Sequence, residues 1–176
     1  MNVTATSALN LPPAERHICL FVRESGQFNL ALWPLLAALS GTSATVILIL
    51  DQVDSRLPEL LADPLVQRMV AAGRLHPMEA ASFYLSEQTF DPAAVFKRLA
   101  HLSFDVAKTG QPLVVIGGIS WAIRQQPGFD LAQYEAGLDK LLVEQPALSM
   151  LVCIYEANYC NGETALAALQ THPVGH

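Results

Sequence analysis

Runs of consecutive apolar residues alternate along this chain with segments of helical periodicity. Four of the runs are short and largely free of charged residues. A fifth run, at residues 74–78, is less apolar. Short apolar runs of this kind are typical of strands buried on both faces of a parallel sheet. The predicted strands span residues 17–22, 44–50, 74–78, 113–116 and 148–155.

The segments between these runs have apolar residues at helical spacings and are bounded by capping residues. Asp91-Pro92 combines an N-cap residue with proline at the first helical position, and Gly73 is a typical C-cap. Proline punctuation at Asp63-Pro64 interrupts one helix, and residues 79–90 are predicted to be a long connection. The predicted helices span about 27–39, 55–72, 91–108, 130–143 and 163–169. This alternation predicts an α/β fold of three layers, with a mainly parallel five-stranded sheet flanked by helices.

Composition places the chain among compact soluble domains. Hydrophobic residues make up 52% of the sequence and charged residues only 15%, against about a quarter in typical domains. We therefore expect a flexible leader at 1–15 and a single domain at 16–176, with some apolar surface left for a homodimer or another partner. No apolar run approaches the ~20 residues of a membrane span, and no signal peptide is evident, so a cytoplasmic location is expected.

Charge and motifs exclude several functions. The net charge of −6, with no cluster of Lys or Arg, argues against direct binding of nucleic acid. The turn at 22–27 has neither a P-loop nor a G-x-G-x-x-G motif, and the chain has no G-x-S-x-G elbow. No basic residue lies where it would clearly activate Cys19 or Cys153 as a nucleophile. We therefore predict no enzymatic activity and no catalytic residue.

The strand at 113–116 ends in Gly117-Gly118, at the carboxyl edge where open α/β sheets bind ligands. Trp121 follows this turn and is interpreted either as a pocket wall or as an anchor for the next helix. Tyr84, with its neighbour Phe83, is interpreted either as a lid over the same edge or as a cover for the core.

Polar residues with metal-binding chemistry lie on the first and last strands. His17 and Cys19 face the same side of one strand, and Cys153 and Tyr155 have the same relation on the other. If the two strands are neighbours, these side chains converge. His17, Cys19 and Cys153 would then be candidates for a soft transition metal, whereas the alternative is ordinary core packing with no cofactor. The predicted ligand-binding set is His17, Cys19, Tyr84, Gly117, Gly118, Trp121, Cys153 and Tyr155.

Several motifs in this order resemble the MEDS family of prokaryotic sensory domains. They are residues 17–21 (HICLF), 117–122 (GGISWA), Tyr134-Glu135 with Leu138, 153–155 (CIY) and 171–173 (THP). The resemblance implies a RecA-like fold without nucleotide chemistry and a role in sensing simple hydrocarbon derivatives. Members are often fused to histidine kinases or DNA-binding helices, and they commonly have an acidic residue where this chain has Gly118.

These observations predict a non-enzymatic small-molecule sensory domain of prokaryotic signal transduction. Because the sequence shows no fused output module, the expected partner is a kinase or transcription factor in trans. The alternative is a homodimeric protein-interaction module with no small ligand.

Overall fold

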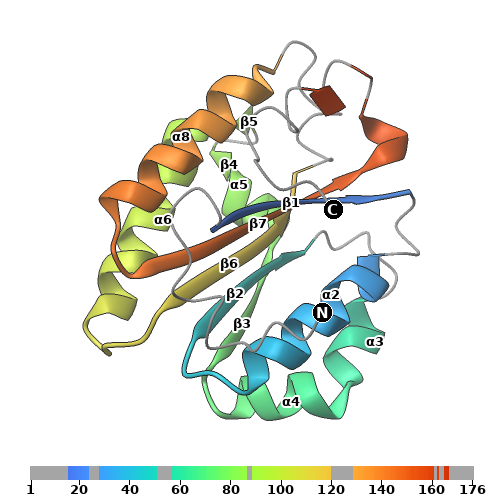
Figure 1. The fold of residues 1–176 in the computed structure, drawn as a ribbon, viewed down its shortest axis with the longest axis vertical. Helices are drawn as coiled ribbons and strands as arrows, with labels where there is room; N and C mark the ends of the chain where they lie inside the picture. The colour runs from blue at the N-terminus through green and yellow to red at the C-terminus, as the bar shows by residue number, and fades with distance from the viewer. Residues whose placement is uncertain are drawn as a thin grey trace.

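The computed structural model describes residues 16–23, 28–50, 57–86, 89–119, 129–160, 162 and 165–166. Its centre is a five-stranded sheet in the order β1-β7-β6-β2-β3, in which every neighbouring pair is parallel (Figure 1). The strands are β1 (His17–Val22), β2 (Thr45–Leu50), β3 (Leu75–Glu79), β6 (Leu113–Gly118) and β7 (Leu148–Glu156). The first strand therefore pairs with the last one at an edge of the sheet.

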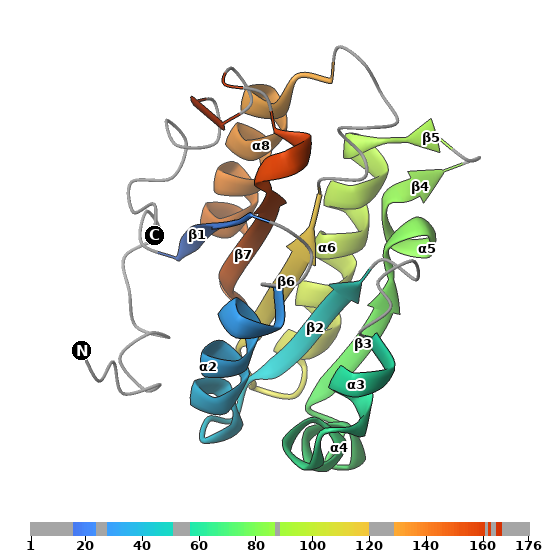
Figure 2. The same cartoon turned by 90° about the vertical axis from the view of Figure 1, so that its right-hand side faces the viewer.

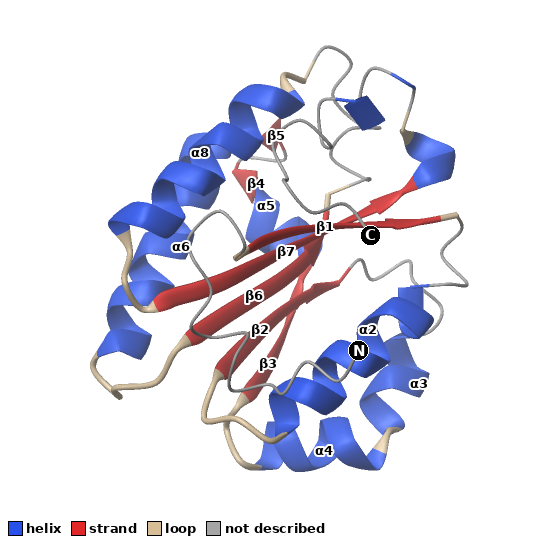
Figure 3. Cartoon of the chain, viewed as in Figure 1, coloured by secondary structure: helices blue, strands red, loops and turns tan. Residues whose placement is uncertain are grey.

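Helices cover both faces of this sheet and give the fold three layers (Figures 2 and 3). One face packs against α2 (Phe28–Ser40), α3 (Leu57–Ala62) and α4 (Pro64–Ala71). The opposite face packs against α5 (Ala80–Tyr84), α6 (Pro92–Ala107) and α8 (Leu131–Glu144). A short 3₁₀ helix, η3 (Ala157–Tyr159), follows β7. The fold class predicted from the sequence is confirmed: an α/β domain with a parallel five-stranded sheet flanked by helices.

Aspartate side chains fix the starts of three helices, as local sequence chemistry dictates. Asp91 Oδ1 accepts hydrogen bonds from the backbone amides at the start of α6, the shorter being 2.9 Å. Asp63 caps α4 at 2.7 Å and Asp130 caps α8 at 2.9 Å. Gly73, with φ of 65°, lies in the left-handed region where the chain leaves α4.

The segment from Glu79 to Phe90 differs from the prediction of a long connection. It contains α5 and a two-stranded antiparallel hairpin of β4 (Leu85–Ser86) and β5 (Thr89–Phe90). Arg98 of α6 explains the difference, because its guanidinium donates to the carbonyl oxygens of Phe83 and Leu85. A side-chain contact from the following helix, which the apolar pattern of the segment does not indicate, holds this segment in place. The predicted leader, Trp121 and most of the terminal helix at 163–169 lie outside the described residues.

No helix in the described part of the chain is long and apolar enough to cross a membrane.

Candidate functional site

The predicted convergence of the first and last strands is confirmed. β1 and β7 pair in parallel, with Cys19 opposite Cys153 and Phe21 opposite Tyr155. His17, Cys153 and Tyr155 are therefore directed toward the face covered by α8, where all three side chains are buried.

His17 is the centre of a buried polar cluster. Its Nδ1 lies 2.8 Å from Oδ1 of Asp139, and its Nε2 lies 3.3 Å from Sγ of Cys153. The same Nε2 is 3.1 Å from Oε2 of Glu135, so both ring nitrogens face polar partners. The side chains of His17 and Glu135 have no exposed surface, whereas that of Asp139 is 43% exposed. One imidazole thus joins a surface acid to a buried acid and a buried thiol.

Glu135 is held by a second contact, since the Tyr155 hydroxyl donates to its Oε1. This bond leaves Oε2 directed toward His17. A fully buried carboxylate is costly unless it is paired and hydrogen-bonded, and Glu135 has both kinds of partner. The position of Glu135 inside the core is therefore set by β1 and β7 together.

The cluster changes the protonation of its members. Burial opposes the charged form of His17, but its contacts with Cys153, Asp139 and Glu135 outweigh this effect and raise the pKa of the imidazole. Burial and the charge of Glu135 raise the pKa of the Cys153 thiol, and His17 offsets only part of that rise. The polar contacts of His17 thus favour its charged form, whereas burial favours the neutral form of the Cys153 thiol.

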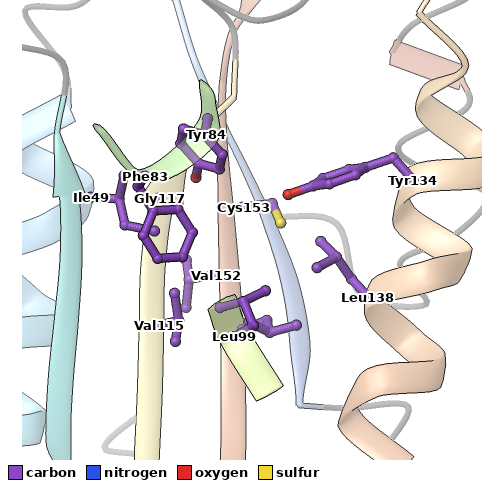
Figure 4. Close-up of a pocket in the computed structure, with 11 residues that line it drawn as sticks. Ile49, Phe83, Tyr84, Leu99, Val115, Gly117, Tyr134, Leu138, Val152 and Cys153 are labelled. Carbon is purple, nitrogen blue, oxygen red and sulfur yellow. The ribbon is translucent and has the colours of Figure 1, made fainter. Parts of the chain in front are cut away.

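A small cavity lies beside this cluster, between the sheet and the helices α5, α6 and α8 (Figure 4). Its volume is about 20 Å³, and Cys153 forms part of its wall. The Tyr134 hydroxyl points toward the Cys153 sulfur across the cavity, and apolar side chains form most of the rest (Figure 4). The lining residues are Ile49, Phe83, Tyr84, Leu99, Val115, Gly117, Tyr134, Leu138, Leu151, Val152 and Cys153.

Gly117 allows a close approach between β6 and α5. A Cβ atom at this position would lie 2.3 Å from the Tyr84 hydroxyl oxygen, which is too close for two non-bonded atoms. The next nearest atoms, on Ile49, would be at an ordinary 3.4 Å. The missing side chain of Gly117 is therefore what lets the Tyr84 hydroxyl reach the strand.

The structure brings together part of the set predicted from the sequence. His17, Cys153 and Tyr155 form the cluster, while Tyr84 and Gly117 line the adjacent cavity. Tyr84 is a buried residue of α5, and its role as a lid stays a prediction. Two other residues are placed differently: Cys19 is fully buried on the same face but is not in the group of potential metal ligands, and Gly118 does not line the cavity. Trp121 lies outside the described residues, so its role stays a prediction.

Sequence reasoning missed the two acidic members of the cluster, Glu135 and Asp139. A signal for Glu135 was present, because it interrupts the apolar stripe of α8 formed by Leu131, Leu138 and Leu142. An acidic residue on the buried stripe of a helix requires a partner in the core. Asp139 lies one turn further along the same helix, and only the pairing of β1 with β7 shows that both residues face His17.

The sheet order and the interior cluster define a parallel α/β domain with buried polar chemistry beside β1 and β7. Comparison of the sequence with protein families then identifies it further. The chain belongs to the MEDS family, described as the methanogen/methylotroph, DcmR sensory domain, whose profile matches residues 16–173. The resemblance noted in the sequence is thereby confirmed, and with it a sensory role.

A solved structure supports the fold. The crystal structure of the flagellar accessory protein FlaH from Methanocaldococcus jannaschii matches with a TM-score of 0.58 and 10% sequence identity. The match covers 94% of this chain and 71% of that chain, and at this identity it shows the fold alone. A search of curated proteins gave no match.

Proposed function

We propose that this domain senses a small, largely apolar molecule, such as a simple hydrocarbon derivative, in the cavity beside His17 and Cys153. The observation that carries the proposal is the juxtaposition of apolar walls with a buried polar cluster. Sites for small molecules combine mostly apolar walls with a few polar groups that fix orientation. Membership of a sensory family supports the same role.

The size of the cavity indicates how binding would be reported. A volume of about 20 Å³ holds roughly one water molecule, which requires about 10–15 Å³. A larger ligand enters only if part of the wall moves, and Tyr84 of α5 is the side chain that closes over Gly117. Ligand binding would therefore favour a conformation in which α5 is displaced, and that population shift is the signal.

The chemistry of the thiols supports a sensor without catalytic activity. Burial is the largest cause that raises the pKa of both Cys19 and Cys153, so neither thiol is ionised at neutral pH. A neutral thiol is a poor nucleophile. We place the output in trans, in the cytoplasm, through a signalling partner such as a kinase or a transcription factor.

Thermal unfolding in the presence of small molecules tests this proposal. Alcohols, amines and ketones of one to six carbons are the probes, and a ligand that binds only the folded state raises the melting temperature. We expect at least one compound to stabilise the wild type, and Gly117→Ala to increase that stabilisation, because the added methyl group displaces the Tyr84 side chain that closes over the cavity. Gly41→Ala is the matched control, since its nearest atom is 3.8 Å from the added Cβ.

Two outcomes contradict the proposal. One is a panel in which no compound raises the melting temperature of the wild type. The other is a folded Gly117→Ala variant that responds no more strongly than the wild type. The control Gly41→Ala variant must retain the response for the comparison to support the site.

The homodimeric interaction module stays the alternative prediction. Five large apolar side chains are exposed in the described residues, namely Leu61, Val70, Phe104, Val143 and Leu166, and a number of exposed apolar residues is normal for a folded domain. Native mass spectrometry gives the number of subunits directly. A dimer that forms without any small molecule, together with a silent ligand panel, would favour the alternative.

A further inference from the structure

We propose that His17, Glu135 and Cys153 bind one divalent transition-metal ion of the zinc type. These three residues offer one nitrogen, one carboxylate oxygen and one sulfur, all within 4.8 Å of one another and all buried. The inference does not depend on the proposed function, because a metal site can exist whether or not a small molecule binds in the cavity.

The two distances from His17 to the other donor atoms are close to those around a tetrahedral ion. Zinc binds nitrogen and oxygen at about 2.0–2.2 Å and sulfur at about 2.3 Å, which places tetrahedral ligands roughly 3.3–3.6 Å apart. His17 Nε2 lies 3.1 Å from Glu135 Oε2 and 3.3 Å from Cys153 Sγ. These two distances are within a few tenths of an ångström of the tetrahedral values, and the Glu135 and Cys153 donor atoms lie within 4.8 Å of each other.

The surrounding contacts orient these ligands for a metal. A histidine that binds zinc through one nitrogen commonly donates its other N–H to a carboxylate, and Asp139 accepts from Nδ1 of His17 at 2.8 Å. The Tyr155 hydroxyl holds the other carboxylate oxygen of Glu135. Asp139 therefore orients Nε2 of His17 toward Cys153, and Tyr155 does the same for Oε2 of Glu135.

This set differs from the one predicted from the sequence, because Glu135 takes the place of Cys19. The difference is testable, since the chain has only three cysteines: Cys19, Cys153 and Cys160. Serine variants of Cys19 and Cys160 serve as matched controls for Cys153→Ser. Only the last of these changes removes a donor atom from the proposed site.

The test uses the full chain purified without a histidine tag. After treatment with a chelator, the protein is titrated with Co²⁺, and a thiolate-to-cobalt charge-transfer band reports a bound sulfur. We expect one Co²⁺ per chain, displaced by Zn²⁺, with the band kept in Cys19→Ser and Cys160→Ser and lost in Cys153→Ser. Asp139→Asn should weaken binding by about 10–100-fold, as is usual for an outer partner of a metal-binding histidine.

Asp139→Asn also guards against misfolding of the core variants, because its side chain is partly exposed. The proposal is overturned if the folded wild type binds neither Co²⁺ nor Zn²⁺ at micromolar concentration. It is also overturned if the thiolate band is lost in Cys19→Ser or Cys160→Ser, or if Asp139→Asn binds as tightly as the wild type. No small organic molecule is present in these measurements, so their failure leaves the ligand panel unaffected.

Discussion

The close approach of Tyr84 to Gly117 gives a prediction whose sign depends on the background in which it is measured. In the wild type, Gly117→Ala places a Cβ atom 2.3 Å from the Tyr84 hydroxyl oxygen. Overpacking of a core costs about 1–3 kcal/mol. Replacing glycine inside a strand returns about 0.5–1 kcal/mol. The free energy of unfolding should therefore fall by up to about 2.5 kcal/mol on these values.

Removal of the hydroxyl should reverse this effect. In a Tyr84→Phe background the nearest remaining atoms are those of Ile49 at 3.4 Å, which is an ordinary contact. Gly117→Ala should then be neutral or stabilising by up to about 1 kcal/mol, because only the gain from replacing a glycine inside a strand remains. The coupling between the two changes should be about 1–3 kcal/mol, the size of the relieved overpacking.

The assay is a double-mutant cycle measured by urea unfolding, followed by far-ultraviolet circular dichroism. The cost of Tyr84→Phe by itself cancels in such a cycle. If Gly117→Ala destabilises the Tyr84→Phe background as much as it destabilises the wild type, the close contact is not what makes glycine necessary. The same result would weaken the use of Gly117→Ala as a probe of the cavity.

Three further predictions concern the cluster, the remaining thiol and a helix cap. Glu135→Gln removes one partner of a buried pair and should lower the free energy of unfolding by about 3 kcal/mol in chelator-treated protein. Asp139→Asn changes a partly exposed side chain and should cost clearly less. Equal stability of Glu135→Gln and the wild type would contradict the pairing. Burial and, to a smaller extent, the charge of Glu156 raise the pKa of Cys160 to about 11. The rate of iodoacetamide labelling of the folded protein should therefore still increase with pH above 9, and Cys160→Ser should abolish this labelling. A rate that levels off below pH 9 would refute the shift. Asp91→Ala should cost about 1 kcal/mol by uncapping α6. Asp105→Ala removes only an exposed pair with Lys108 and should cost clearly less, so comparable losses in urea unfolding would argue against the cap.

The sheet was predictable because its strands are marked locally. A continuous apolar run such as residues 45–50 has few alternatives to a buried strand, and the caps at Asp63 and Asp91 define helix starts within one turn. The segment at 79–90 was not predictable in this way. Arg98 holds it from another helix, and that contact has no counterpart in the local pattern.

The site was predictable only in part for a related reason. Period-two alternation in a strand put His17 on the same side as Cys19, and Cys153 on the same side as Tyr155. The two pairs of side chains lie together only because β1 pairs with β7. The order of strands in a sheet is a property of the whole fold, so the local pattern could not predict it. Glu135 belongs to a helix on which every other buried neighbour is apolar or aromatic, so its partner could be named only after the layers were known.

The pairing of β1 with β7 also has a consequence for the order in which the domain matures. His17 and Cys153 are 136 positions apart, so their contact is among the most non-local in the chain. Contacts between such distant positions are slow to form, and during synthesis β1 has no strand to pair with until β7 has left the ribosome. The cluster can therefore form only in a chain that has been synthesised at least as far as β7. Whatever binds there would stabilise finished molecules selectively and leave nascent ones unaffected.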